Sequence, residues 1–189
     1  MAHQTKITGL VLAGGAGRRV GGRDKGLISW AGKPLVQHVV ERIKPQVDTV
    51  IISCNRNCER YRQFASATVH DLRPGHAGPL AGLEAAYPSI ATDLLLLVSC
   101  DTPLLPDDLV LRLTTELRRS SAEVEICYAH DGHRAHYLCA ALRRASLASV
   151  ADFLDDGGRA VRDWFHSRGA RAVDFSDSRE AFMNLNAHL

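Results

Sequence analysis

The run DLLLLVSC at residues 93–100 restricts the possible folds of this chain more than any other feature. Nearly every side chain in it is apolar, which is typical of a strand covered on both faces, and so of a central strand in a parallel sheet. Other short apolar runs alternate along the chain with segments whose apolar spacing suits helices. The expected strands are 7–13, 48–54, 67–70 and 93–100, and the expected helices are 34–43, 58–65, 78–90 and 106–120. This alternation predicts an α/β fold with a doubly wound, mostly parallel sheet and helices on both faces.

The second half of the chain has a less regular pattern. Residues 123–130 and 134–142 alternate in polarity and flank the dipeptide Asp131-Gly132, which predicts a hairpin. Residues 146–158 and 159–169 suit helices, and 170–177 suit a last strand. No repeat, linker or low-complexity segment interrupts the pattern, so we expect residues 1–189 to form a single domain.

Composition excludes several classes of protein. With 189 residues, 46% of them hydrophobic and 23% charged, the chain is ordinary for a globular protein with one core. A net charge of +2 gives no support for a nucleic-acid partner. No apolar run reaches the roughly 18 residues of a membrane span, and the N-terminus lacks an apolar signal core, so we expect a cytoplasmic protein. The five cysteines are odd in number and have no CxxC spacing, which predicts reduced thiols.

A glycine-rich segment follows the first expected strand. Residues 14–22 read GGAGRRVGG and contain five glycines, and RDKG follows directly. Bare backbone of this kind lets N–H groups approach an anion closely. Arg19 and Lys25 can neutralise a triphosphate, the arginine through forked hydrogen bonds and the lysine as a point charge. The alternative is a flexible loop with solvated cations.

The segment matches neither of two common phosphate-binding motifs. It is no P-loop, because Asp24 precedes Lys25 where glycine belongs and Gly26 follows it where serine or threonine is required. It is no dinucleotide fingerprint, because Val20 occupies the position of the third glycine.

Four motifs together resemble the molybdenum cofactor guanylyltransferase family. They are LAGGAGRRVGGRDKGL (12–27), GPLAGL (78–83), SCDTP (99–103) and FMNLN (182–186), and they follow one another in the family's order. The resemblance implies a Rossmann-like fold of the nucleotide-diphospho-sugar transferase type. It also implies Mg²⁺ as cofactor and transfer of GMP from GTP to molybdopterin, with release of pyrophosphate.

The resemblance assigns most of the nucleotide site to the ends of strands and to the glycine-rich segment. Asp71, after the short strand 67–70, matches a nucleotide-contacting aspartate. The family often has asparagine at the end of strand 48–54, where this chain has Ser53, with Asn55 two residues later, so the assignment stays open between them. The other positions carried over are Leu12, Ala13 and Gly14 for the guanine nucleotide and Gly15, Arg19, Gly22 and Lys25 for its phosphates.

Asp101 is the strongest single candidate, as catalytic residue together with Arg19 and Lys25. It follows the apolar strand, at the sheet edge where open α/β folds bind ligands. A carboxylate there suits Mg²⁺, which prefers oxygen ligands and often shares substrate phosphates. The alternative is a cap for helix 106–120, although Asp107 and Asp108 are expected to lie in the first turn of that helix already.

The second-substrate side rests on weaker signals. The resemblance implies Gly78, Pro79, Asn184 and Asn186, and the two asparagines are expected on alternating positions of a strand near the pterin phosphate and the metal. The Thr-Pro that usually follows this pair in the family is replaced by Ala187-His188, and the family's final helix is absent. The alternative is a frayed terminus.

Three histidines in the second half have no clear role in this pattern. His130, His133 and His136 are spaced by three, but the expected turn separates them. We therefore predict a solvated hairpin tip, with a contact to the pterin as the alternative.

The resemblance also implies a division of labour and a set of partners. Residues 1–120 are expected to bind the nucleotide and 121–189 to face the second substrate. GTP and molybdopterin are the implied substrates, and other cofactor-biosynthesis proteins and recipient molybdoenzymes are possible partners of a monomer. Two alternatives stay open: a related transferase that uses CTP or a sugar phosphate, and a non-catalytic nucleotide-binding module.

Overall fold

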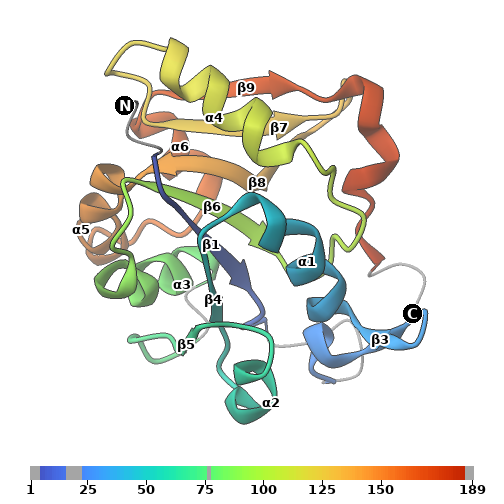
Figure 1. Cartoon of the computed structure of the whole chain (residues 1–189). Coiled ribbons are helices and arrows are strands. Elements are labelled where there is room, and N and C mark those ends of the chain that lie inside the picture. Colours follow the sequence, from blue (N-terminus) through green and yellow to red (C-terminus); the bar gives the residue numbers. More distant parts are fainter. Residues whose placement is uncertain (1–4, 16–22, 76–77, 186–189) are drawn as a thin grey trace.

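A mixed seven-stranded sheet forms the centre of the protein (Figure 1). The computed structural model describes residues 5–15, 23–75 and 78–185. Strand order is β5-β4-β1-β6-β8-β7-β9, and only β8 runs antiparallel to its neighbours, so the predicted mostly parallel α/β sheet is confirmed. The strands are β1 Ile7–Leu12, β4 Thr49–Ser53, β5 Ala67–Val69, β6 Leu94–Ser99, β7 Ile126–His130, β8 Ala135–Arg143 and β9 Ala170–Asp174.

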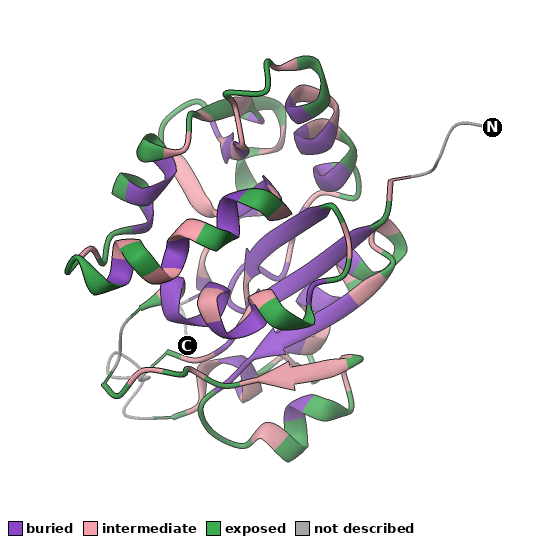
Figure 2. Cartoon of the chain, turned by 90° about the vertical axis from the view of Figure 1, so that its left-hand side faces the viewer, coloured by how far each residue is buried: buried purple, intermediate pink, exposed green. Residues whose placement is uncertain are grey.

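The central strand β6 shows why the apolar run determines the fold. Leu96 and Val98 point into one core layer, while Leu95 and Leu97 point into the other, and all four are fully buried. Helices with apolar faces cover both sides of the sheet, as the burial colours of Figure 2 show. On one side lie α1 Leu35–Ile43, α2 Cys58–Arg62 and α4 Leu109–Arg119, and on the other α3 Pro79–Ala86, α5 Val150–Asp155 and α6 Val161–Ser167.

The predicted hairpin is also confirmed. Strands β7 and β8 pair antiparallel around a turn at residues 131–134, with a bulge between Tyr128 and Ala129. Gly132 has a φ of +88° in that turn, a conformation that glycine adopts without strain. After the turn, β8 runs back between β7 and β6 and pairs with both. Residues 131–134 therefore lie at one end of the sheet.

Several predicted helices are shorter than their sequence patterns. Helix α3 ends at Ala86 and continues as a 3₁₀ turn, Tyr87–Ser89, because Pro88 cannot donate a helical hydrogen bond. Residues 144–149 form a 3₁₀ turn before α5. Helix α4 begins at Leu109, so Asp107 and Asp108 lie before it. The prediction that they lie in its first turn is wrong.

A small hairpin was missed by the sequence reasoning. Strands β2 Ser29–Trp30 and β3 Lys33–Pro34 pair antiparallel. Ala31 and Gly32 between them both have positive φ, the conformation of the tightest hairpin turns. None of the helices in the described ranges is long and apolar enough to span a membrane.

The parallel strands end together at one edge of the sheet. The N–H of Ala13 donates to the carbonyl of Ser53 at 2.8 Å, and the N–H of Cys100 donates to the carbonyl of Leu12 at 3.0 Å. These bonds hold the residues just beyond β1, β4 and β6 side by side, at the edge where α/β sheets bind ligands.

Candidate active site

Three polar side chains from distant parts of the chain meet at this edge. Lys25 forms an ion pair with Asp101, and both side chains are largely buried. The amide nitrogen of Asn184 donates to the same Asp101 carboxylate oxygen at 2.7 Å, and the ammonium of Lys25 lies 3.4 Å from the amide oxygen of Asn184. The cluster therefore brings together one cation, one carboxylate and one amide, which can bind phosphate oxygens or a hard metal ion.

Asp101 is held by its position after β6 and does not cap a helix. The backbone N–H of Leu185 donates to the Asp101 carbonyl at 3.2 Å, and the hydroxyl of Thr102 donates to the Ser99 carbonyl at 3.1 Å. Asp108 directly precedes α4, so the capping alternative for Asp101 does not apply. Its carboxylate faces the sheet edge, together with Lys25.

A second polar group lies at the ends of β1, β4 and β5. The amide of Asn55 donates to the carboxylate of Asp71 at 2.8 Å and accepts from the backbone N–H of Asp71 at 2.9 Å. The same amide nitrogen is 3.4 Å from the carbonyl of Gly14. Three segments that are far apart in the sequence thus form one exposed hydrogen-bonding surface beside Ala13, Gly14 and Gly15.

Ser53 has a different environment from Asn55. Its side chain is buried beneath α3, where a Cβ added to Gly82 would lie 2.8 Å from the Ser53 hydroxyl and 2.7 Å from the Leu12 side chain. Gly82 is therefore needed for close packing of α3 on the strand ends. Ser53 and the Leu12 side chain contribute to that packing, whereas Asn55 lies on the exposed side of the strand end.

The segment that carries Lys25 is fastened to α2 by residues that sequence reasoning missed. The Tyr61 hydroxyl donates to the carboxylate of Asp24, and the Asn57 amide donates to the other carboxylate oxygen at 2.9 Å. Tyr61 is fully buried; burial raises the pKa of its hydroxyl and the bond to Asp24 raises it further, so the hydroxyl stays protonated. A Cβ on Gly26 would lie 2.5 Å from that hydroxyl. Asp24 and Gly26, on either side of Lys25, thus both pack against Tyr61. The only feature of the sequence that singled out Asp24 and Gly26 was their departure from the P-loop pattern.

Other predicted residues have separate positions. Gly78 has a φ of +78° and precedes Pro79 at the start of α3, where it faces the carbonyl of Arg159. The prediction that Asn184 lies in a strand is wrong. Asn184 lies in irregular backbone after a 3₁₀ turn, Ser176–Phe182. Predictions on Arg19, Gly22 and Asn186 fall outside the described residues.

The hairpin histidines differ among themselves. His136 is not at a solvated tip, because its ring nitrogen lies 2.8 Å from the Asp131 carboxylate and its ring stacks on Phe182 at a centroid distance of 4.7 Å. Burial lowers the pKa of His136. His133 is exposed, as expected for a tip.

The cysteines are free thiols, and the one beside Asp101 is no nucleophile. Cys100 is buried, and burial, helped by the negative charge of Asp101, raises the pKa of its thiol to about 12. A thiol with so high a pKa stays protonated near neutral pH and reacts poorly.

Fold and site together define an α/β protein with a polar cluster at the carboxyl ends of its parallel strands, where such sheets bind ligands. The structure superposes on molybdopterin-guanine dinucleotide biosynthesis protein A of Archaeoglobus fulgidus with a TM-score of 0.76 and 20% identity, over 95% of this chain and 92% of that one. It also resembles 4-diphosphocytidyl-2C-methyl-D-erythritolsynthase of Anaerococcus prevotii, with a TM-score of 0.72 and 10% identity, over 97% and 92% of the two chains. At these identities the likeness establishes the fold alone.

Sequence comparison defines the family. Residues 9–172 match the MobA-like NTP transferase domain, and the chain belongs to that family. It is 39% identical over 181 residues to a molybdenum cofactor guanylyltransferase of Shewanella halifaxensis, covering 96% of this chain and 90% of the relative. It is 40% identical over 181 residues to the enzyme of that name from Shewanella loihica, covering 96% and 91%.

Proposed function

We propose that this protein is a cytoplasmic guanylyltransferase that transfers GMP from GTP to molybdopterin and releases pyrophosphate. The Lys25–Asp101–Asn184 cluster carries the proposal, because it joins a phosphate-binding cation to a carboxylate suited to a metal ion at the ligand-binding edge of the sheet. Similarity to guanylyltransferases over nearly the whole chain supports the choice of substrates. The five free thiols suit the reducing cytoplasm.

The nucleotide lies, in this proposal, along the ends of β1, β4 and β5. Asn55, and not Ser53, contacts it, because Ser53 is buried under α3 while Asn55 is exposed beside Gly14 and Asp71. Guanine offers N–H donors that carbonyl and carboxylate oxygens accept. The carbonyls of Leu12 and Gly14 already accept protein hydrogen bonds, and each keeps a second lone pair for the base. Arg19, Gly15, Gly22 and Lys25 hold the phosphates.

The residues present fit a Mg²⁺ ion. Asp101 and Asn184 offer hard oxygen donors, and no cluster of three or more His, Cys, Asp or Glu side chains exists in the described ranges, so substrate phosphates would complete the coordination. When bound there, the ion supplies charge stabilisation at the transferring phosphate. Lys25 and Arg19 bind the leaving pyrophosphate and take up its growing charge. The attacking phosphate of molybdopterin is already anionic, so no strong general base is needed.

We propose a division of the chain between the two substrates that agrees with this cluster. Residues 1–120 supply the nucleotide contacts and Asp101, while Asn184 reaches the cluster from residues 121–189. We place molybdopterin on that second side, close to Gly78, Pro79, Asn184 and Asn186. Recipient molybdoenzymes and other cofactor-biosynthesis proteins are the partners we propose for a monomer.

Nucleotide preference tests the function most directly. Incubation of the protein with Mg²⁺, molybdopterin and each nucleoside triphosphate in turn should yield the guanine dinucleotide. GTP is expected to exceed CTP at least tenfold in kcat/KM, about 1.4 kcal/mol of transition-state discrimination. Equal use of the two would remove the guanine assignment, and nucleotide binding without any transfer would leave the binding-module alternative.

The ion pair of Lys25 with Asp101 leads to a second prediction. Two cations compete for one carboxylate, so metal binding must displace the ammonium of Lys25 unless nucleotide phosphates draw it away. Lys25→Met is expected to bind Mn²⁺, used as a spectroscopic substitute for Mg²⁺, about tenfold more tightly without nucleotide. The same variant should bind GTP more weakly, because it lacks the charge.

Electron paramagnetic resonance titration of free Mn²⁺ measures the first effect, and calorimetry measures the second. Lys33→Met is the matched control, since Lys33 pairs with Glu41 on the surface at 2.8 Å. Unchanged Mn²⁺ affinity in Lys25→Met would show that the two cations do not share the Asp101 carboxylate.

A further inference from the structure

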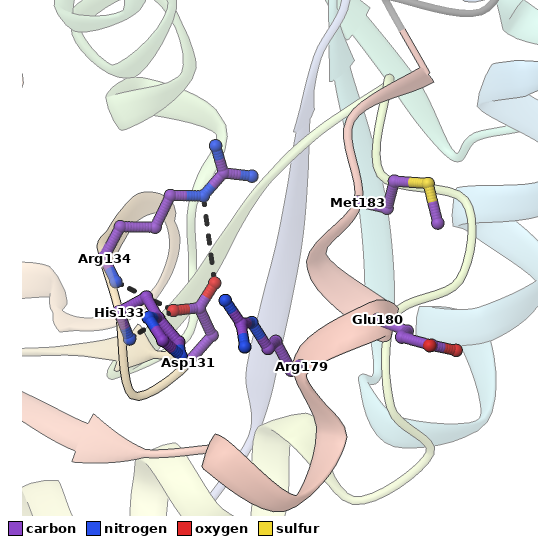
Figure 3. A pocket seen from close by; sticks show the side chains of 6 residues that line it. All are labelled: Asp131, His133, Arg134, Arg179, Glu180 and Met183. Carbon is purple, nitrogen blue, oxygen red and sulfur yellow. Dashed lines mark hydrogen bonds and ion pairs between the residues drawn. The ribbon is translucent and has the colours of Figure 1, made fainter.

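An open cavity of about 540 Å³ lies between the β7–β8 turn and the C-terminal segment. Its lining comes from two places in the chain, as Figure 3 shows. Met183, on its rim, directly precedes Asn184, whose amide contacts Asp101. The cavity is therefore next to the reaction centre but separate from the nucleotide surface at Asn55 and Asp71. The residues that line it are Asp131, His133, Arg134, Arg179, Glu180 and Met183.

The two walls of the cavity, the β7–β8 turn and the C-terminal segment, are in contact with each other through side chains. One carboxylate oxygen of Asp131 accepts from the backbone N–H groups of His133 and Arg134, each at 2.8 Å, and the other oxygen lies 2.8 Å from the His136 ring nitrogen. His136 stacks in turn on Phe182 of the C-terminal segment. A cavity with walls tied in this way is formed before a ligand arrives.

The lining of the cavity contains two arginines and two carboxylates, so its formal charge is balanced, and what a ligand meets depends on which of these groups are already engaged. Burial raises the pKa of Asp131, but hydrogen bonds from Arg134, His136 and His133 outweigh it and hold that pKa below its usual range, so the carboxylate is charged and already satisfied within the wall. Arg134 is 64% exposed and lies 3.8 Å from Asp131, a long contact. Arg179 extends toward the turn and forms no ion pair with any residue of the described segments.

We infer that this cavity receives the pterin–dithiolene body of molybdopterin, with its terminal phosphate directed past Asn184 toward Asp101. This inference rests on the proposed function. The guanidinium groups of Arg134 and Arg179 pair with the anionic dithiolene end. On the opposite rim, the Glu180 carboxylate accepts hydrogen bonds from the N–H donors of the pterin, and Met183 provides apolar contact. The volume is in the range of small-molecule sites.

The test uses Arg134→Met and Arg179→Met, which remove the charge and keep a flexible apolar chain. Each is expected to raise the KM for molybdopterin at least tenfold while the KM for GTP stays within about twofold. Binding of anaerobic molybdopterin, followed by its pterin fluorescence without GTP, should weaken by the same factor. Arg162→Met is the matched control, because Arg162 is exposed on α6 and pairs only with the adjacent Asp163 among the described residues.

Each outcome separates this inference from the proposed function. If wild type transfers GMP and both variants keep the wild-type KM for molybdopterin, the inference fails and the function stands. If the KM for GTP rises as much as that for molybdopterin, the arginines act on the reaction centre as a whole, and the inference also fails. If wild type forms no dinucleotide but binds molybdopterin through these arginines, the proposed function fails and the cavity assignment stands. Melting temperatures near that of wild type show that the variants fold.

Discussion

Asp101→Asn is expected to lose GMP transfer on the order of a thousandfold while GTP still binds. Asparagine keeps the size of aspartate and one acceptor oxygen, so the hydrogen bond from Asn184 survives. The change removes the negative charge that we assign to metal binding and that pairs with Lys25. Lys25 and the glycine-rich segment remain to bind the phosphates. Calorimetry measures GTP binding, and dinucleotide formation across a Mg²⁺ titration measures transfer.

The Mg²⁺ titration gives this prediction its sharpest form. Added Mg²⁺ should recover part of the rate in Asp101→Asn, because mass action offsets weaker metal binding. Asp107→Asn is the control: Asp107 follows the same strand, is 82% exposed and pairs with Arg42 on the surface, so its removal should change neither binding nor transfer. Normal turnover of Asp101→Asn would show that this carboxylate does not hold the metal.

Asp24→Ala is expected to lose activity without removing any group that contacts substrate. The variant leaves the buried Tyr61 hydroxyl without its acceptor, which costs about 1–3 kcal/mol of folding free energy. It also frees the segment that aims Lys25 at the reaction centre, and a misplacement of about 1 Å costs roughly a hundredfold in rate. Chemical denaturation measures the stability, and steady-state kinetics with GTP and molybdopterin measure the activity.

The double variant Asp24→Ala with Tyr61→Phe distinguishes positioning from general instability. Phenylalanine removes the unsatisfied hydroxyl, so the double variant should be more stable than Asp24→Ala alone, with a coupling of about 0.5–3 kcal/mol. Its activity should stay low, because Lys25 remains untethered. Recovery of activity together with stability would show that Asp24 acts only through folding. Asp156→Ala is the control for loss of a carboxylate, because Asp156 is exposed at the end of α5. Asp48→Ala would not serve, because the Asp48 carboxylate accepts a hydrogen bond from the backbone N–H of Ile7.

The order of elements could be predicted because each depends on local periodicity. The continuous apolar run at β6 requires cover on both faces, and the structure provides it. The Asp131-Gly132 dipeptide between two alternating segments predicted the β7–β8 hairpin, because this dipeptide favours a tight turn. Helix ends were less predictable. Pro88 marked the end of α3, but apolar spacing does not show that α4 starts only after Asp108.

The sequence by itself determined the α/β alternation, the family and the placement of Asp101 after the central strand. Only the tertiary structure decided which side chains meet. It buried Ser53 beneath Gly82 and exposed Asn55 beside Asp71, a choice that depends on how α3 packs on the strand ends. It brought Asn184 to Asp101 and Tyr61 to Asp24 across separations of 83 and 37 residues. Such contacts arise from the burial of whole elements against one another, and no local pattern of residues encodes them.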